Sequence, residues 1–547
     1  MLIRALLLIA MAQAPVPAQD PDADQGIPID NEAVKQRCGS CHAADDKGRM
    51  SRISFRRTTP EGWQQTIKRM VALNGVKLTP EEARVIVKYL SNRLGLAPEE
   101  ARLAQFEVER RVIDFQYKAS PETEATCNRC HSVGRVLLQR RTKQEWGLLI
   151  AMHRGYYPLS DFQAFRRTGP PQREPGPDGR PPDNRHPMEK AIDHLSGAFP
   201  LKTAEWTGWS AAAGTARVEG KWALSGYETG KGWAFGQMTV RRDREEDAFV
   251  TDVEFRYARS GEQVTRTGRA IVYTGFQWRG RSGTGDGQFR EVMLVERNRR
   301  EMSGRWFQGA YDERGMDVKL VRIGSDALVS GVHPEALKAG SGAAEVTVYG
   351  ANLGAGDVDL GPGVKVNRVV RATPSQVMVE VTVDAKAAIG RRDVAVGGAV
   401  KERALAIFDK VDAIKVRPQA GLARIGGVRF PKGYQQFEAM GVHYGADGKP
   451  DTADDVDLGL MPVAWSIEEY TATFGDDDKQ FVGSLDANGL FTPAIDGPNP
   501  MRRNNTNNMG DVWVVATYEG DKKLRARAHL LVSPPVYMRF DQPEVGQ

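Results

Sequence analysis

The sequence predicts a multidomain α plus all-β protein, in which an N-terminal α-helical domain precedes three antiparallel β-domains. The chain has 547 residues, and a chain of this length usually folds into several domains, each with its own hydrophobic core. Up to about residue 200 it shows amphipathic helical patterns and two Cys-x-x-Cys-His motifs. Beyond that point it consists of short runs that alternate apolar and polar residues between glycine-rich turns.

The first residues have the order of charges and apolar groups that is typical of a secretory signal peptide. Arg4 precedes an apolar run over residues 5–12, and Ala14 and Ala18 offer small residues for cleavage. The run is too short to cross a membrane. We therefore predict a signal peptide over residues 1–18, no membrane span and a periplasmic protein, with a buried N-terminal helix as the alternative.

The charge of the chain gives no support to nucleic-acid binding. The formal net charge is +5, which is small for this length. The basic and acidic residues are interleaved rather than collected in blocks, so no basic patch is expected.

All four cysteines fall in two motifs, Cys38-Gly-Ser-Cys41-His42 and Cys127-Asn-Arg-Cys130-His131. In this pattern the two thiols attach to the vinyl groups of a porphyrin, and the following histidine ligates the iron. Zinc or disulfides are the alternatives, but each pair has its own histidine. The motifs predict two covalently bound haem c groups, and residues 19–200 are expected to form an α-helical di-haem cytochrome c domain. The predicted haem-binding residues are Cys38, Cys41, His42, Cys127, Cys130 and His131.

An internal repeat indicates the remaining iron ligands. Aligning Trp63 with Trp146 places Met70 and His153 at the same position, seven residues later, on helices that both read as amphipathic. Both residue types serve as axial haem ligands. We therefore predict iron ligation by His42/Met70 and by His131/His153. Without the repeat, Met70 would be interpreted as a residue that packs in the core, and His153 as a hydrogen-bonded histidine of the core or surface. The competing candidates are Met50, Met152, Met188, His186 and His194.

Residues 201–547 are expected to form three β-domains. Residues 201–327 predict an antiparallel, barrel-like domain, and residues 328–410 and 411–547 each predict an immunoglobulin-like domain. The acidic segment Asp447–Asp457 lacks the spacing of a calcium loop, so a solvated turn is favoured over calcium binding. No nucleophile elbow, phosphate loop or paired carboxylate motif is present, and no catalytic residue is predicted on this chain.

The chain resembles the α subunit of quinohaemoprotein amine dehydrogenase over essentially its whole length. The most specific segments are the two Cys-x-x-Cys-His motifs, Trp63–Met70, Trp146-Gly-Leu-Leu-Ile-Ala-Met-His153-Arg-Gly-Tyr-Tyr-Pro158 and Ala198-Phe-Pro-Leu201. The resemblance implies that the iron ligands carry over at His42, Met70, His131 and His153.

The resemblance also implies a periplasmic heterotrimer that oxidatively deaminates primary amines. A small γ subunit would carry cysteine tryptophylquinone, and a β-propeller subunit would complete the active site. This chain would pass electrons from the quinone to a blue-copper protein or a soluble cytochrome c. Two other readings remain open: a stand-alone exported di-haem electron-transfer protein with β docking domains, and a cytochrome peroxidase, which would need an open haem position.

Overall fold

The computed structural model describes most of the chain. The described residues are 25–104, 117–127, 131, 133–166, 170–171, 173–175, 179, 181–212, 214–308, 314–354, 356–471, 475 and 477–535. The predicted signal peptide, residues 1–18, lies outside them. No helix within these ranges is long and apolar enough to cross a membrane.

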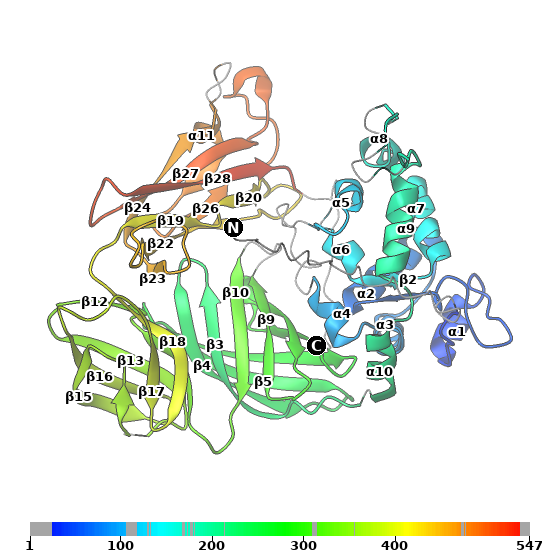
Figure 1. Cartoon of the computed structure of the whole chain (residues 1–547). Coiled ribbons are helices and arrows are strands. Elements are labelled where there is room, and N and C mark those ends of the chain that lie inside the picture. Colours follow the sequence, from blue (N-terminus) through cyan, green and yellow to red (C-terminus); the bar gives the residue numbers. More distant parts are fainter. Residues whose placement is uncertain are drawn as a thin grey trace, which may run out of the picture.

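The N-terminal part is α-helical, as predicted (Figure 1). Three of its longer helices begin at threonine N-caps, Thr59, Thr79 and Thr142, whose side chains accept backbone N–H groups of the first turn. Its elements are α1 (Glu32–Cys38), β1 (Arg56–Thr58), α2 (Pro60–Asn74), α3 (Pro80–Arg93), α4 (Pro98–Arg102), α5 (Pro121–Cys127), α6 (Gly134–Leu137), β2 (Gln139–Arg141), α7 (Lys143–Tyr156), α8 (Ser160–Gln163), α9 (Pro187–Ala198) and α10 (Ala204–Ala212).

The two copies of the sequence repeat form two lobes that meet at a short antiparallel sheet. Strand β1 precedes α2, and strand β2 precedes α7. In their register Arg57 faces Arg140, and Arg56 faces Arg141. Arg57 and Arg140 each lie six residues before the tryptophan of their copy, so the pairing relates the lobes by an approximate twofold axis. Trp63 and Trp146 are fully buried at equivalent places in the two lobes.

The central β-domain is a closed antiparallel barrel. Its strands alternate inward apolar and outward polar residues, and Trp222, Trp278 and Trp306 are fully buried. Closure leaves no free sheet edge. The strands are β3 (Gly220–Glu228), β4 (Gly232–Arg242), β5 (Ala248–Tyr257), β6 (Gln263–Tyr273), β7 (Gln277–Ser282), β8 (Phe289–Val295), β9 (Glu301–Gln308) and β10 (Gly315–Arg322).

Two further β units follow the barrel, each built from more than one sheet around a valine-rich core. Most pairings are antiparallel, but β12 with β18 and β20 with β28 run parallel. The first unit holds β11 (Leu328–His333), β12 (Ala336–Lys338), β13 (Ala344–Ala351), β14 (Val358–Asp359), β15 (Val364–Thr373), β16 (Gln376–Val383), β17 (Gly390–Val396) and β18 (Ala399–Phe408). The second holds β19 (Ala413–Arg417), β20 (Ala420–Arg424), β21 (Gln435–Gln436), β22 (Glu438–His443), β23 (Val456–Leu460), β24 (Val463–Glu469), α11 (Asp478–Phe481), β25 (Gly483–Leu485), β26 (Leu490–Pro493), β27 (Gly510–Tyr518) and β28 (Arg525–Ser533).

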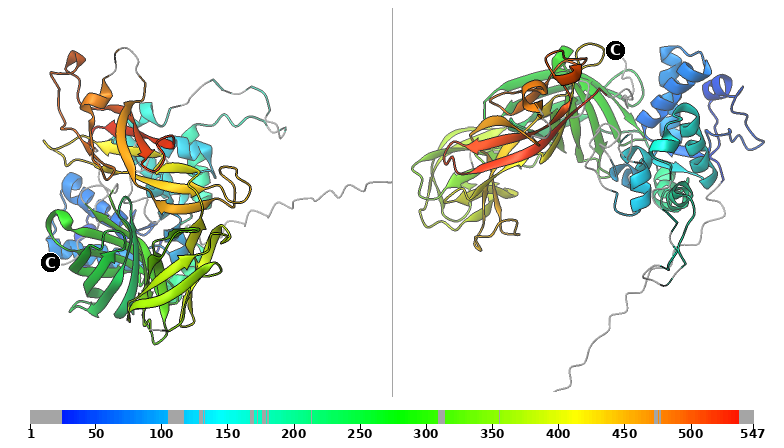
Figure 2. Two further views of the ribbon diagram at one scale, coloured as in Figure 1. Left: turned by 90° about the vertical axis from the view of Figure 1, so that its left-hand side faces the viewer. Right: turned by 90° about the horizontal axis from the view of Figure 1, so that it is seen from above.

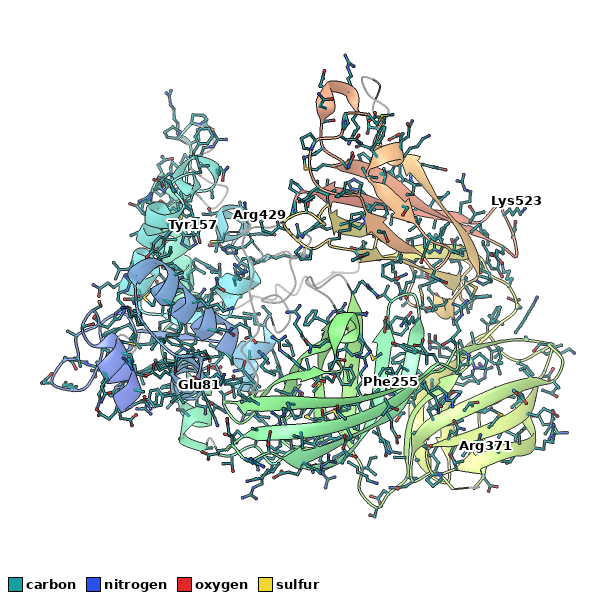
Figure 3. All side chains as sticks on the ribbon, turned by 180° about the vertical axis from the view of Figure 1, so that it is seen from behind. Glu81, Tyr157, Phe255, Arg371, Arg429 and Lys523 are labelled. Atoms are coloured by element: carbon teal, nitrogen blue, oxygen red, sulfur yellow. The ribbon has the colours of Figure 1, made fainter. Side chains whose placement is uncertain are left out.

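The barrel contacts all the other parts of the molecule. Arg279 of β7 forms a fully buried ion pair with Glu61 of α2, in the helical part. Trp233 of β4 donates its indole N–H to Glu335, before β12, at 2.9 Å. Tyr227 of β3 donates to Glu438 of β22, also at 2.9 Å. The barrel therefore lies between the helical part and the first of the later β units, and the second β unit lies above the barrel in Figure 3; Figure 2 shows the same parts from two other sides.

Candidate haem-binding sites

The first Cys-x-x-Cys-His motif lies at the end of α1. Asn31 caps this helix, and its side-chain oxygen accepts the Val34 N–H at 3.1 Å. After Cys38 the chain turns sharply, because the N–H groups of Cys41 and His42 both bond to the Cys38 carbonyl, at 3.2 and 2.9 Å. The turn gathers the two thiols and the imidazole of the motif within one loop.

The ring of His42 is held in one orientation by a backbone carbonyl. Its Nδ1 lies 2.9 Å from the carbonyl oxygen of Ser51. A carbonyl can only accept, so Nδ1 carries the proton and Nε2 keeps its lone pair. This is the arrangement that metal-binding histidines commonly show, with one ring nitrogen anchored and the other available to the metal.

The second motif begins at the end of α5, where Cys127 lies. Ser120 starts the helix, and its hydroxyl oxygen accepts the Thr123 N–H at 3.2 Å. Cys130, the other predicted attachment residue, lies outside the described residues. Burial raises the pKa of the Cys127 thiol to about 12. Burial, and then the neighbouring Cys41, raise the pKa of the Cys38 thiol. By their exposed surface both thiols are half-buried.

The structure brings the predicted ligands His131 and His153 together. Their ring centroids are 6.5 Å apart. Metal–imidazole bonds are about 2 Å long, and the bonded nitrogen lies about 1.2 Å from the ring centre. Two imidazoles on opposite sides of one iron would therefore have ring centres about 6.4 Å apart. The observed separation fits a shared iron atom.

His153 is also oriented by a carbonyl, in this case from its own helix. Its Nδ1 lies 2.8 Å from the Leu149 oxygen, one turn earlier in α7, so Nε2 keeps its lone pair. Burial, reinforced by Arg141 and Arg69, lowers the pKa of His153 although the Leu149 carbonyl opposes the shift. The ring is therefore neutral near pH 7, and neutral imidazole is the form that ligates iron.

Met70 occupies the equivalent place near the end of α2. It is half-buried, and its carbonyl accepts the N–H of Gly75, whose left-handed φ of 71° ends the helix. Met70 and His42 come from separate elements, and their pairing on one iron stays a prediction.

The competing candidates have structural roles of their own. Met50 is 1% exposed in the core that also contacts Cys38, and it precedes Ser51, whose carbonyl holds the His42 ring. Met152 is a half-buried residue of α7, Met188 packs in a small core with Ile150 and Phe165, His186 caps α9, and His194 bonds to the Tyr117 hydroxyl at 2.8 Å.

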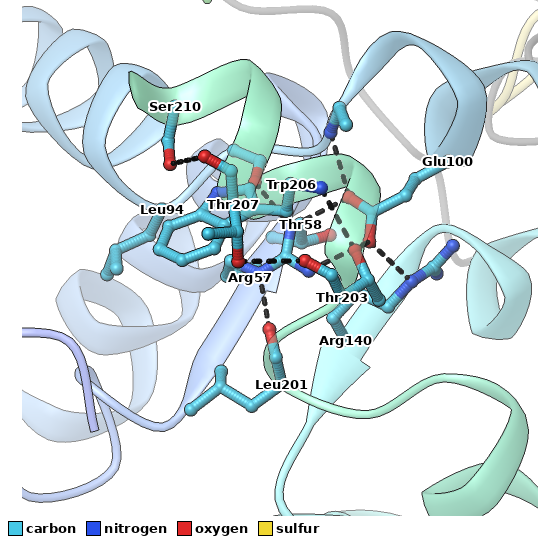
Figure 4. Close-up of polar contacts among 12 residues, drawn as sticks. Arg57, Thr58, Leu94, Glu100, Arg140, Leu201, Thr203, Trp206, Thr207 and Ser210 are labelled. Atoms are coloured by element: carbon cyan, nitrogen blue, oxygen red, sulfur yellow. Dashed lines mark hydrogen bonds and ion pairs between the residues drawn. The ribbon is translucent and has the colours of Figure 1, made fainter. Parts of the chain in front are cut away.

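A buried charge cluster joins the two lobes at their twofold axis (Figure 4). The Glu100 carboxylate accepts from Arg57 Nη1 and Nη2 at 2.7 and 2.8 Å and from Arg140 Nε at 3.0 Å. Thr203 donates a further bond at 2.9 Å. Burial alone would raise the pKa of Glu100, but the two arginines outweigh it and bring the pKa to about 2. Sequence reasoning missed this cluster, although the arginines at matching places in both copies were a signal for it.

Comparisons with known proteins cover most of the chain. Four family models of the quinohemoprotein amine dehydrogenase α subunit match it. The haem-binding model matches residues 29–169, domain II residues 215–323, domain III residues 326–409 and domain IV residues 414–545. No curated protein matches the chain.

Three solved structures each resemble part of the chain. A redesigned β-barrel is 13% identical, covering 20% of this chain and 92% of its own, with a TM-score of 0.17. A bacterial integrin-binding invasin is 10% identical, covering 56% and 79%, with a TM-score of 0.13. A Bacteroides ovatus mixed-linkage glucan utilization protein is 10% identical, covering 57% and 61%, with a TM-score of 0.18.

Proposed function

The chain belongs to the family of quinohaemoprotein amine dehydrogenase α subunits, and from this premise we propose that it is the di-haem electron-transfer subunit of a periplasmic amine dehydrogenase. In this role it would receive electrons from a cysteine tryptophylquinone on a small partner subunit. It would pass them through two covalently bound c-type haems to a blue-copper protein or a soluble cytochrome c. The overall reaction would be the oxidative deamination of primary amines.

The pair His131 and His153 carries this proposal. Two imidazoles, one following a Cys-x-x-Cys pair and the other on the repeat-related helix, have ring centres 6.5 Å apart and would hold one haem iron between them. Bound haem would supply reversible one-electron transfer. The carbonyls of Ser51 and Leu149 orient the rings of His42 and His153 through Nδ1, and their Nε2 atoms would hold the iron.

The chain's cysteines support placing the quinone on another subunit. All four cysteines belong to the haem motifs, so none remains to cross-link to a tryptophan. The three β units extend the surface of the chain beyond the helical part, and obligate interfaces commonly need large areas. We infer that they hold the γ subunit and the β-propeller subunit of a heterotrimer.

The test is to purify the native protein from its own cells and to identify its subunits. We expect a small quinone-bearing chain and a β-propeller chain to co-purify, and the mass of this chain to include two haem groups. Denatured protein should keep its haem stain on a gel. A chain that purifies alone with two haems would indicate the stand-alone electron-transfer protein instead, and a chain with one haem or none would overturn the di-haem proposal.

A further inference from the structure

A cavity of about 510 Å³ lies between the barrel and the first of the later β units. Small-molecule sites in proteins are roughly 300–1,000 Å³ in volume. One wall is the outer face of the barrel at β3, β4, β9 and β10, and the other comes from β11, β17 and β18, which lie beside β3 and β4 in Figure 1. Every lining residue belongs to the β units, so the cavity is separate from the predicted haem sites.

Aromatic side chains of the β3–β4 pair form the apolar part of the barrel wall. Tyr227 and Trp233 are cross-strand neighbours, and their ring centroids are 5.2 Å apart. Trp233 and Phe235 point to the same face of β4 and stack with centroids 6.0 Å apart and planes inclined by 9°. Phe235 stacks in turn on Tyr349 of β13, at 4.6 Å. Because these rings pack against one another, they give the cavity a preformed apolar wall.

The carboxylate of Glu335 also lines the cavity, and no cation pairs with it in the part of the chain that the structure describes. By contrast, Asp317 and Lys319 of the barrel wall have ion-pair partners at 2.8 and 3.0 Å. Glu335 Oε2 accepts the Trp233 indole N–H at 2.9 Å, whereas Oε1 accepts no hydrogen bond from any described residue. A side chain at position 459 would lie 2.9 Å from Oε1, but β23 has Gly459 there. Oε1 is therefore left available to a donor.

The surroundings of Glu335 favour a bound cation. The side chain is half-buried, and this burial is the main cause that raises the pKa of its carboxyl. Asp457 and Glu438 add to the rise in pKa, while the Trp233 N–H and Arg391 oppose it. An unpaired charge in such a place is costly, and a cationic group bound against it would lower the cost. An ammonium group suits Oε1, because its N–H groups only donate.

Basic residues of β17 and β18 limit which cations the cavity could take. Both Nη atoms of Arg391 donate to backbone carbonyls, that of Arg403 at 3.2 Å and that of Asp457 at 2.9 Å. Lys401 and Arg403 also line the cavity, and both residues are exposed. Their charges would repel a second positive group on a ligand. The cavity therefore fits a compound with one ammonium group and an apolar body.

We propose that this cavity binds a small monoamine in its protonated form. The ammonium group would bond to Glu335 Oε1, and the apolar body would lie against Tyr227, Trp233 and Phe235. Because such a ligand would contact both walls, it would stabilise the packing of the barrel against the first of the later β units. The site contains none of the predicted haem-binding residues, so the proposal does not depend on the electron-transfer role.

The test measures the binding of N,N-dimethyl-2-phenylethylamine to the full-length holoprotein by titration calorimetry. A tertiary amine cannot condense with a quinone carbonyl, so a quinone on a partner subunit would not consume it. We expect one site per chain with a Kd of about 1 mM or tighter. 3-Phenylpropionate, which joins the same apolar body to a negative group, should bind at least about tenfold more weakly. No saturable binding of the amine up to about 10 mM, or equal binding of the two compounds, would overturn the proposal.

A diamine tests the limit to one positive charge. 1,4-Diaminobutane would bring a second ammonium group close to Arg391, Lys401 and Arg403, and it should bind at least about threefold more weakly than the monoamine. Equal or tighter binding of the diamine would contradict the proposed ligand class.

Two matched substitutions test the carboxylate itself. Glu335→Gln keeps an oxygen that can accept the Trp233 N–H but removes the charge, and it should weaken binding of the amine at least about tenfold. Glu402→Gln is the control, because Glu402 is an exposed carboxylate in the lining of the same cavity, and it should change the Kd less than about threefold. Unchanged affinity in Glu335→Gln would contradict the proposal.

Hydrogen exchange followed by mass spectrometry locates the bound amine without any substitution. The amine should slow exchange in β11 and β18, and it should leave β28, which contributes nothing to the cavity, unchanged. Protection confined to other parts of the chain would overturn the proposal. If Glu335→Gln does not fold, the comparison of the amine with the anion and the exchange pattern of the wild-type protein still decide the outcome.

Discussion

Arg57 and Arg140 lie opposite each other across the β1–β2 pair, and both donate to the same buried carboxylate, that of Glu100. Two like charges at directly opposed positions of a sheet would repel one another. The negative charge of Glu100 offsets that repulsion. Its oxygens accept hydrogen bonds from one arginine of each lobe, so the carboxylate links the two lobes. The Glu100 carboxylate is thus one of the contacts that hold the two lobes together, beside the β1–β2 pair and the Arg52–Glu145 ion pair.

Replacing Glu100 by glutamine should destabilise the protein by about 3 kcal/mol or more. The change keeps the shape of the side chain but leaves two buried guanidinium groups without an anion, and breaking a buried ion pair from one side typically costs about 3–5 kcal/mol. Denaturant unfolding of the holoprotein, followed by haem absorbance, measures the effect. Glu81→Gln is the control, because Glu81 pairs with Arg84 on the surface and should lose less than about 1 kcal/mol.

The same carboxylate predicts how stability depends on pH. Its folded pKa is about 2, below the ordinary value of 4.5. The stabilisation it gives is therefore complete above about pH 5 and is lost as the pH falls from there toward 2. Its size is on the order of 3 kcal/mol. Burial lowers the pKa of Arg140 to about 10 even beside Glu100, so part of this gain is offset by the cost of burying the arginine. Unfolding titrations at several pH values should show the loss in wild type and a flatter curve in Glu100→Gln.

The buried pair between Glu61 and Arg279 should anchor the first lobe to the barrel. Glu61 is 0% and Arg279 2% exposed, and a second contact between them, from Nη2, is 3.2 Å long. Arg279→Leu leaves a buried carboxylate unpaired and should cost about 3–5 kcal/mol. Adding Glu61→Leu should restore a large part of that loss, because two apolar side chains can replace a buried ion pair at little cost. A double variant no more stable than Arg279→Leu would contradict this account.

The sequence predicts the order of helical and β parts along the chain better than it predicts the contacts between those parts. Alternating runs such as 249–257 indicated strands, and the barrel places 248–257 in β5. The repeat predicted that His131 and His153 would share a site, because equivalent positions keep equivalent surroundings, and the structure brings the two rings together. Glu61, Glu100 and Arg279 were not singled out. A charged residue is predicted to be exposed unless its partner is known. Glu100 and its partner Arg57 are 43 residues apart in the sequence, and Glu61 and Arg279 are 218 residues apart.

The predicted ligands would set the direction of electron flow, which can be tested by exchanging them. A thioether is a weaker donor than imidazole and favours reduced iron, so methionine ligation raises a haem's potential. The His131/His153 haem should be the lower-potential centre and the His42/Met70 haem the higher one. Electrons from a reduced quinone would then pass from the second haem to the first.

Redox titrations of Met70→His and His153→Met provide the measurement. Met70→His should lower the higher potential, remove the sulfur-to-iron absorption band and leave the other haem nearly unchanged. His153→Met should raise the lower potential. Met50→Leu is the matched control, because it removes the thioether of the buried competitor while keeping an apolar side chain in the core, and it should leave both potentials and the band in place. If Met70→His keeps the band and Met50→Leu loses it, Met50 is the ligand. The alignment of Trp63 with Trp146 would then relate the two helices, but Met70 and His153, seven residues after each tryptophan, would not have equivalent roles. The downhill order of the haem potentials would then have to depend on burial and charge alone.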